Sequence, residues 1–518
     1  EGHNWYLHGM HTLPQVGLLF PEFKRSAYFV RSPWSMVEEH VRGHLKSDGG
    51  ARETTLGYQA GSMLCLWDMY LNATRNGWPT SPGMADRLLH ATKFVLRLAT
   101  PIGSLPSFGD TQPSRGQLMT LAAFAAAVTG DGECKWYAQR DRALLADNAG
   151  ESQEQIPLGA FWYVGLAGAA TYANTRAKDP KHTSVFHGMT GYAAMRDSDA
   201  TDATYLAIAA AERGPIVTSH GHNDIFAIEM HAFGTKFIGE AGCAPYGDSP
   251  GRQYDQITAA HSTLDIEDNE QVPVIDEWRW AHQLMPALRR WISEPTHDFF
   301  HGTHEGFYAY RQHESLHARK VVFLKPVGDV PGYAVIFDWV ESNIERDYRV
   351  HFHGCVPGRL DGQAIMLTDE AGARLWIAPP ADDALTCRQV TSDGLSAYLS
   401  EKKLDPKSHP HFTYSRSGLS DCFIWVLMPL ASGVAEPRVQ RLPVRLDDTA
   451  VAPGVATAVR IKHAVGTDVV CISHKDYDGE LSFGDDTAFG HLAIRRRDGR
   501  DNACVVIDHT MVDGVTGR

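Results

Sequence analysis

The densest group of side chains able to do chemistry lies in TSHGHNDIFAIEMHAFGTKFIGEAG, residues 218–242. If 219–231 is a strand, its two-residue period places His220, His222 and Asp224 on one face. Two imidazoles and a carboxylate at one strand end suit proton transfer or metal binding. The alternative is a polar, exposed strand start that runs into a buried strand and needs no chemistry.

A further imidazole, His261, stands just before another alternating stretch at 262–267. Two histidines on different strands and one carboxylate form an ordinary ligand set for Zn²⁺, and Glu240, after the strand-like FIGE, is the nearest oxygen donor. Asp224 would then orient one of the imidazoles. Because a spacing this long is no signature, a metal site and a set of ordinary buried polar residues both stay open.

A second group opens the chain in GHNWYLHGMH, with His3 and Asn4, and continues in SDGGARETTLGYQAG. There Arg52, Glu53 and Tyr58 stand where a glycine-rich loop enters a helix. Each has an ordinary alternative, since the aromatic start can pack on helices and a lone tyrosine is more often a core residue with a satisfied hydroxyl. Only the combination points to a site.

The elements that must position these groups change in kind along the chain. Apolar residues at three and four spacing, separated by Gly-, Pro- and Asp-rich breaks, predict helices at 56–73, 84–99, 116–129 and 134–147. Alternating β-rich runs predict strands at 205–210, 225–230, 333–340, 349–353 and 422–427. Helices followed by strands indicate an α+β protein with a boundary at about 150–185, and a weaker break falls at 429–443.

Composition excludes several classes of protein. The 518 residues include 48 Lys and Arg against 62 Asp and Glu, a formal charge of -14, which disfavours a nucleic-acid binder. No apolar run is long enough for a membrane span. The eight cysteines are scattered without a C-x-x-C pair, and the chain lacks a G-x-S-x-G elbow, a phosphate-binding loop and an H-E-x-x-H motif.

The ordered motifs resemble those of the heparinase II/III-like polysaccharide lyases. The likeness is carried by HNW, SDGGARETTLGY, PSFGD at 106–110, HGHNDIFAIEMHAFGTKFIGEAG and AAHSTLDIEDNEQ. It implies an incomplete (α/α) toroid at 1–175, with further toroid helices ahead of residue 1. It also implies an antiparallel β-sandwich at 176–430, with strands at 431–518 that complete the sandwich or form a small β domain.

The resemblance also implies β-elimination at a uronic acid and gives the residues their roles. Tyr58 is the catalytic tyrosine, His220 the catalytic or neutralising histidine, and Asn4 the ligand of the uronate carboxylate. The substrate-binding residues that it implies are His3, Arg52, Glu53, Tyr254 and its competitor Tyr246. The implied ligands of a structural divalent metal, Zn²⁺, are His222, Glu240 and His261. To act as a phenolate, Tyr58 needs a cationic or hydrogen-bonding neighbour, with Arg52 or a protonated histidine as candidates.

The expected substrate is an acidic polysaccharide or oligosaccharide. The acidic chain favours an unsulfated uronan, with alginate leading and exolytic action expected, over heparin, heparan sulfate or another glycosaminoglycan. Two rivals are a zinc-dependent hydrolase, which would make saturated ends, and a non-catalytic carbohydrate-binding protein. A periplasmic or secreted location, or the cytoplasm for an enzyme of oligosaccharides, and a homodimer complete the expectations, with no nucleic-acid or membrane partner.

Overall fold

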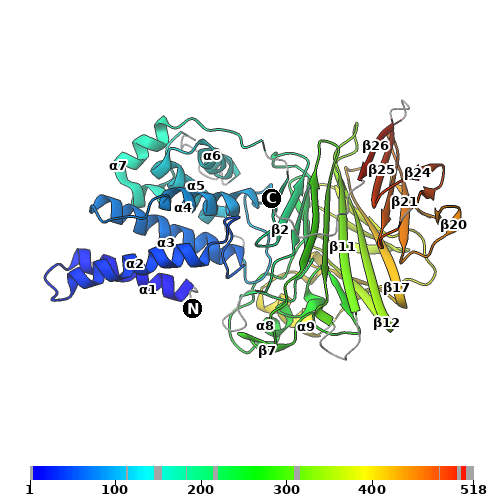
Figure 1. Ribbon diagram of the computed structural model, residues 1–518, viewed down its shortest axis with the longest axis horizontal. Coiled ribbons are helices and arrows are strands. Elements are labelled where there is room, and N and C mark those ends of the chain that lie inside the picture. Colours follow the sequence, from blue (N-terminus) through cyan, green and yellow to red (C-terminus); the bar gives the residue numbers. More distant parts are fainter. Residues whose placement is uncertain are drawn as a thin grey trace.

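The computed structural model describes residues 4–112, 115–144, 154–181, 184–213, 220–307, 315–391, 393–477, 479–498 and 503–508. Helices come first and strands second, at opposite ends of an elongated molecule (Figure 1). The last helix of the first part ends at Asn174 and the first strand begins at Val185. The predicted α+β class is therefore confirmed.

The helical part consists of helices that pack mainly on their neighbours in the chain. Their bounds are α1 Asn4–Leu19, α2 Ser26–His44, α3 Leu56–Arg75, α4 Met84–Arg97, α5 Arg115–Thr129, α6 Gly132–Leu144 and α7 Leu158–Asn174. The Gly- and Pro-rich breaks fall between these helices, as expected of residues that end a helix. The predicted helices at 56–73, 84–99, 116–129 and 134–147 coincide with α3 to α6 to within a few residues.

Two stacked antiparallel sheets follow the helical part. The first has the order β1 to β5, with bounds Val185–His187, Tyr192–Arg196, Tyr205–Ala209, Ile228–Ala232 and Thr235–Ile238. The second has ten strands, centred on the long strands β12 (Tyr333–His353) and β17 (His411–Leu430). Its other members are β6 Leu264–Ile266, β9 Ala287–Ser293, β10 His297–His304, β11 Ser315–Leu324, β13 Gly358–Asp361, β14 Ala364–Thr368, β15 Arg374–Ala378 and β16 Thr386–Val390.

Alternation along the strands explains how the layers stack. In β2 and β3, Tyr192 and Tyr205 pack into the helical core, whereas Met195 and Ile208 pack against the ten-stranded sheet. Because successive side chains point to opposite faces, the first sheet is buried on both sides between the helices and the second sheet. The hydroxyl of Tyr205 donates to the Leu98 carbonyl at 2.7 Å, which ties this sheet to the end of α4.

The C-terminal strands form a further layer on the outer face of the ten-stranded sheet. Val335 and Phe337 of β12 share one core cluster with Val459 and Val470. The strands of this layer make a five-stranded sheet with bounds β18 Arg438–Leu442, β21 Ala456–His463, β22 Gly466–Ser473, β25 Leu492–Asp498 and β26 Ala503–Asp508. A four-stranded sheet beside it has bounds β19 Val444–Leu446, β20 Thr449–Ala450, β23 Leu481–Phe483 and β24 Asp486–Ala488.

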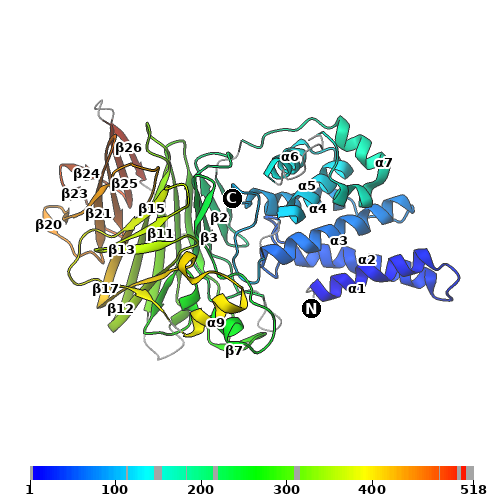
Figure 2. The same ribbon diagram turned by 180° about the vertical axis from the view of Figure 1, so that it is seen from behind.

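Short elements gather at the junction of the helices and the sheets. Helix α8 (Pro250–Asp255), the strands β7 (Val274–Asp276) and β8 (Arg279–Trp280), and helix α9 (Asp393–Glu401) are insertions between strands. Figures 1 and 2 both place α8 or α9 and β7 on the side of the molecule where α1 begins. The polar segments singled out above lie at this junction.

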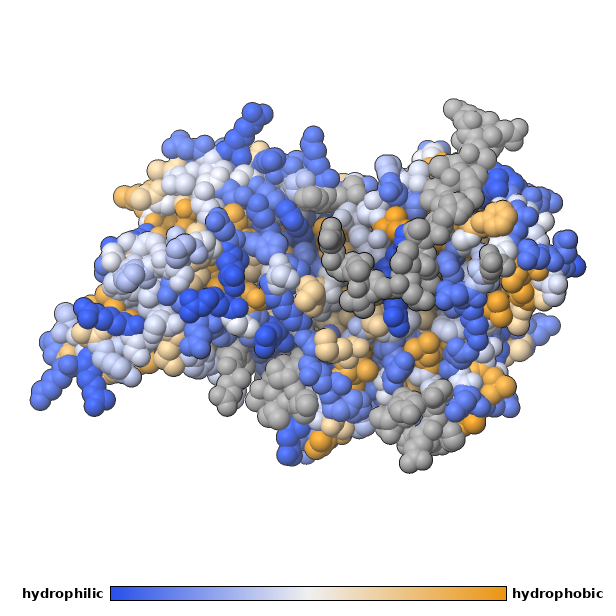
Figure 3. Space-filling view, viewed as in Figure 1, coloured by the Kyte–Doolittle hydropathy of each residue, from blue (hydrophilic) through white to orange (hydrophobic). Residues whose placement is uncertain are grey.

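One predicted strand is wrong in part. The proposed strand at 219–231 starts only at Ile228, and residues 220–227 form a loop in which Phe226 has φ 62. Residues 214–219 lie outside the described part. On the face shown in Figure 3 hydrophobic residues are scattered in small groups among hydrophilic ones. No helix within the described residues is long and apolar enough to cross a membrane.

Candidate active site

Tyr58 enters the site through the turn that precedes α3. Thr54 has φ 58, and its carbonyl accepts a hydrogen bond from the Tyr192 hydroxyl at 2.5 Å, which fastens the turn to the first sheet. Helix α3 begins at Leu56, so Tyr58 stands in its first turn. Glu53, just before the turn, is 3% exposed and lies 3.4 Å from the Nε2 atom of His220.

The loop PSFGD is joined to the histidine-bearing loop. The Gly109 amide donates to Asp224 Oδ2 at 2.9 Å, and the Asp110 amide donates to the His220 carbonyl at 2.9 Å. Gly109 has φ 54, and a Cβ atom there would lie 2.7 Å from the same carbonyl oxygen. Only glycine allows so close an approach of the two backbones. The Asp224 carboxylate and the His220 carbonyl therefore hold the two loops together.

Asp110 is the hub of the site. Its buried carboxylate is hydrogen-bonded to Arg252 Nη1 at 2.5 Å and Nη2 at 3.0 Å, and to His220 Nδ1 and His222 Nε2, each at 2.8 Å. Burial by itself would raise the pKa of Asp110, but the hydrogen bonds from His220 and His222 and the charge of Arg252 hold it well below its usual value. Asp110 is thus an ionised acceptor that fixes both imidazole rings.

Two tyrosines and a histidine meet beside this carboxylate. The ring of Tyr58 stacks on His220 with 3.8 Å between centroids, and the Tyr58 hydroxyl is hydrogen-bonded to that of Tyr246. The Tyr246 hydroxyl also lies 3.2 Å from Asp110 Oδ2 and 3.3 Å from His220 Nδ1. The sequence predicted the meeting of Tyr58 with His220 and left open which of two further tyrosines joins them.

The surroundings of Tyr58 bear on the expectation of a cationic or hydrogen-bonding neighbour. Arg52 is exposed, and its charge acts on His44. Burial raises the pKa of Tyr58, so the phenol keeps its proton in the ligand-free site. Burial likewise raises the pKa of Glu53. Arg52 was one of two candidates for the neighbour that lowers the pKa of Tyr58; the hydrogen bond to Tyr246 acts in that direction here, against the larger effect of burial.

A cleft of about 360 Å³ opens above Tyr58, and Asn4, Asp110 and Gln117 also line it. Asn4, at the start of α1, is 8% exposed, and its Oδ1 atom accepts the Trp5 amide at 2.9 Å. The Asn4 amide nitrogen is thus the group that can donate into the cleft. His3 lies outside the described residues.

Tyr254 lies apart from this cluster. It is 7% exposed, in the short helix α8, and its ring packs on that of Tyr398 with 5.5 Å between centroids. It lines a separate cavity of about 300 Å³ together with Glu240 and Lys402. Tyr246, in the loop before α8, is the tyrosine that is hydrogen-bonded to Tyr58.

The expected metal ligands are close neighbours that bond to other partners. His261 Nδ1 is hydrogen-bonded to Glu240, His222 Nε2 faces Asp110, and the centroids of the two imidazole rings are 5.5 Å apart. His222 Nδ1 and His261 Nε2 are buried without a hydrogen-bond partner. Within the described residues, no three His, Cys, Asp or Glu side chains already converge as metal ligands.

Two family models match the chain. One, described as heparinase II/III N-terminus, matches residues 1–131, and the other, heparinase II/III-like, C-terminal, matches residues 179–412. The chain belongs to the heparinase II/III-like family. Tyr58 and Asp110 lie in the part matched by the first model, whereas His220 and Tyr246 lie in the part matched by the second. The cluster is therefore built from both parts that define the family. No curated protein matches the chain.

Solved structures of heparinases share the fold. A heparan sulfate lyase from Pedobacter heparinus superimposes with a TM-score of 0.67 at 17% identity, covering 91% of this chain and 66% of that one. A structure titled heparinase III gives 0.67 at 16% identity, covering 95% and 67%, and a second heparinase III gene product gives 0.66 at 16%, covering 90% and 65%. This heparinase II/III-like chain thus spans about two thirds of the length of these structures.

Three members of the site escaped the reasoning from sequence. Asp110 lies inside the matched motif PSFGD, but one aspartate among 62 acidic residues carries no mark of its role. Arg252 and Trp278, whose indole lies 5.7 Å from the His220 ring, come from segments with no distinctive pattern. The aspartate that ends a motif already matched to the heparinase II/III-like family was the one available signal.

Proposed function

We propose that the protein is a polysaccharide lyase that cleaves a uronate-containing glycosaminoglycan of the heparan sulfate kind by β-elimination. The observation that carries this proposal is the stacking of Tyr58 on His220 beside the cleft that Asn4 lines. These groups supply what the reaction needs: a donor to the uronate carboxylate, a base and a proton donor.

The first requirement is to offset the charge of the uronate carboxylate, because that charge opposes removal of the neighbouring C5 proton. Asn4 is placed to donate its amide N–H to a carboxylate held in the cleft. A donor aimed at the oxygens where charge builds up can stabilise the transition state by about 3 to 4 kcal/mol. Asn4 therefore has a binding role and an electrostatic role.

The second requirement is a proton transfer in each direction. The base removes the C5 proton, the electron pair forms the C4–C5 double bond, and the C4–O bond breaks as its oxygen takes a proton. Tyr58, whose pKa burial raises, suits the proton donor. His220, oriented by Asp110 at 2.8 Å, suits the base. If proton and leaving group lie on one face of the sugar, Tyr58 would serve in both roles.

Two arguments bear on the class of substrate: the net charge of the chain and the similarity of its fold to solved structures. The net charge of the chain favoured alginate, but net charge acts at long range, whereas local donors decide what a cleft holds. The similar solved structures are named as heparan sulfate lyase or heparinase III, and this supports the glycosaminoglycan alternative. Exolytic action stays a prediction.

Absorbance of the unsaturated uronate tests the proposal. The protein would be incubated with heparan sulfate, heparosan, hyaluronan, chondroitin, polymannuronate and polyguluronate, beside the Tyr58→Phe variant. We expect a rise with a glycosaminoglycan and a loss of about 10²- to 10⁴-fold in the variant. New reducing ends without a rise in absorbance would replace elimination by hydrolysis, and binding without either product would indicate a carbohydrate-binding protein.

We also propose a structural divalent metal, Zn²⁺, held by His222, Glu240 and His261. The support is the pair of buried, unpartnered nitrogens, His222 Nδ1 and His261 Nε2, because such atoms are costly unless a ligand satisfies them. The metal would hold the loop that carries His220. Elemental analysis of the purified protein and its melting temperature with and without chelator are the test. Absence of bound metal from wild type, or equal content in a His261→Ala variant, would contradict it.

A further inference from the structure

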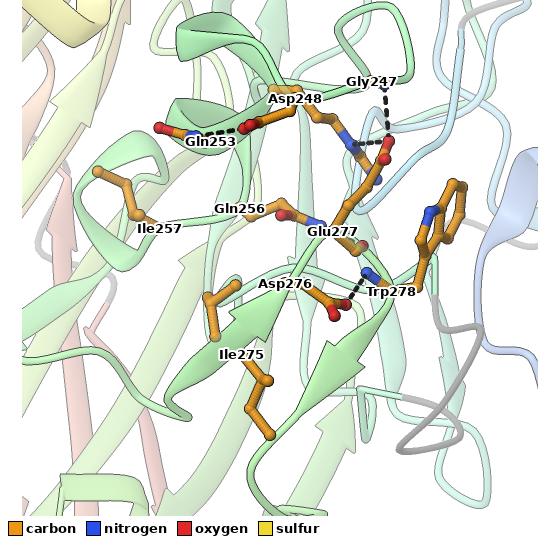
Figure 4. Close-up of a pocket in the computed structure, with 11 residues that line it drawn as sticks. Gly247, Asp248, Gln253, Gln256, Ile257, Ile275, Asp276, Glu277 and Trp278 are labelled. Carbon is orange, nitrogen blue, oxygen red and sulfur yellow. Dashed lines mark hydrogen bonds and ion pairs between the residues drawn. The ribbon is translucent and has the colours of Figure 1, made fainter.

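A cavity of about 640 Å³, separate from the cleft that Asn4 lines, lies around Asp248, Gln256 and Trp278 (Figure 4). Trp278 forms part of its wall, and the indole also lies 5.7 Å from the His220 ring, edge-on at 89°, and 5.1 Å from the Tyr246 ring. Trp278 is half-buried. Trp278 therefore both lines this cavity and contacts the aromatic rings of the candidate active site.

The hairpin that carries Trp278 is firmly held. Trp280, two residues on, is 1% exposed, and the guanidinium of Arg213 lies 3.2 Å from the centroid of its ring. Arg213 also donates to Asn223 Oδ1 at 2.5 Å, within the loop of His220. The Trp278 amide donates to Asp276 Oδ1 at 3.0 Å. The backbone that carries the indole is thus anchored before any ligand arrives, which lowers the entropic cost of binding.

The polar lining of the cavity sets the kind of ring that fits. Figure 4 shows Asp248, Gln253, Asp276 and Glu277 around it, and their carboxylate and amide oxygens accept hydrogen bonds from hydroxyl groups. The cation in the wall, Arg252, already faces Asp110 and Asp255. A second carboxylate entering the cavity would meet a net negative lining, whereas an uncharged sugar would not.

We infer that Trp278 is the stacking platform of a subsite for an uncharged hexopyranose ring bonded to the uronate. The inference rests on the proposed function. The apolar C–H face of the sugar lies on the indole, and its hydroxyls face Asp248 and Asp276. With the uronate carboxylate at Asn4, the chain crosses Tyr58 and His220 into this cavity. An alternating uronate–hexosamine polymer fits this order of sites, and a polymer of uronates alone does not.

Kinetics of Trp278→Ala, Trp278→Phe and wild type on heparosan, an alternating glucuronate–N-acetylglucosamine polymer, test the inference. We expect Trp278→Ala to raise KM about tenfold with kcat within about threefold, and Trp278→Phe to restore most of the loss. The matched control is Trp162→Ala, since Trp162 is 77% exposed on α7, and it should leave KM unchanged. An unchanged KM in Trp278→Ala would overturn the subsite, as would faster turnover of polymannuronate than of heparosan.

Binding separates failure of the subsite from failure of the proposed function. Calorimetry with a heparosan tetrasaccharide measures Kd for wild type and for Trp278→Ala without need of turnover. If wild type turns over no polymer but Trp278→Ala still weakens Kd about tenfold, elimination is wrong and the subsite stands. If wild type turns over heparosan and both proteins share one KM and Kd, the subsite is wrong and elimination stands. No binding and no turnover would overturn both.

Discussion

Replacing Asp110 by asparagine removes one charge from the centre of the site and little volume. The carboxylate that Arg252 contacts at 2.5 and 3.0 Å would become an amide, and one face of that amide must present N–H to a donor. Arg252 keeps Asp255 as a partner at 3.2 Å, so the loss in the free energy of unfolding should stay below the about 3 to 5 kcal/mol expected when a buried ion has no partner left. Loss of the acceptor for His220 Nδ1 lets the ring choose another orientation, and in other enzymes a comparable aspartate-to-asparagine change lowers kcat by about 10⁴-fold.

The matched control is Asp255→Asn. Asp255 is equally buried and contacts Arg252 at 3.2 Å, but its nearest approach to His222 Nε2 is 3.9 Å. We expect both variants to lose stability in urea unfolding and only Asp110→Asn to lose at least about 10²-fold in kcat on heparan sulfate. If folded Asp110→Asn kept its kcat within about threefold of wild type, the assignment of Asp110 as the residue that orients His220 would be refuted.

Three further predictions concern the tyrosine pair of the site and two ionisable groups outside it. Tyr246→Phe should lower kcat while Tyr254→Phe leaves it unchanged, because only the Tyr246 hydroxyl meets Tyr58; equal effects in the lyase assay would argue against this. Burial opposes protonation of His11, but the hydrogen bond to Asp68 raises the pKa of His11 to about 9. The contribution of His11 to stability is therefore complete below about pH 6.5 and lost as pH rises through 9. The melting temperatures of wild type and His11→Gln should converge near pH 9, and a gap that stays constant with pH would contradict this prediction. Burial would raise the pKa of Glu229, but Lys236 and His231 lower it to about 2. The contribution of Glu229 to stability is therefore present above about pH 4.3 and lost as pH falls toward 2. The stability of Glu229→Gln should lack this dependence on acid pH, and identical acid-unfolding profiles of variant and wild type would count against the prediction.

The helices were predictable because their signals are local. In α4, Leu88 and Val95 belong to an apolar stripe that the structure buries, and Gly83 precedes the helix in a left-handed conformation. Such spacing and breakers act within a few residues of the chain. The bounds of α3 to α6 therefore needed no knowledge of the remaining fold.

The histidine segment was less predictable because its structure depends on contacts with residues far away in the sequence. Residues 220–227 alternate as a strand would, but the His220 carbonyl is taken by the Asp110 amide and the Asp224 carboxylate by the Gly109 amide. A loop more than a hundred positions earlier thus replaces the neighbouring strand. His220 and His222 still converge, on a carboxylate that the sequence did not single out.

The short helix α8 determines which of the two tyrosines, Tyr246 or Tyr254, contacts Tyr58. Ser249 caps α8 by accepting the Arg252 amide, and the helix turns Tyr254 toward Tyr398 while Arg252 faces Asp110. A single turn of helix carries too weak a periodicity to show which side chain points inward. Packing with α9, far along the chain, decides it.

The contact between Asp110 and Arg252 also indicates when the site can form during folding. The two residues are 142 positions apart, one beyond α4 in the helical part and one in α8 among the strands. Contacts of such separation pay their loop-closure entropy late, after the local elements have formed. Helices and sheets can each assemble while the carboxylate, the guanidinium and the imidazoles are still apart. Catalytic competence therefore requires that helices and sheets have docked, so activity regained during refolding reports that docking.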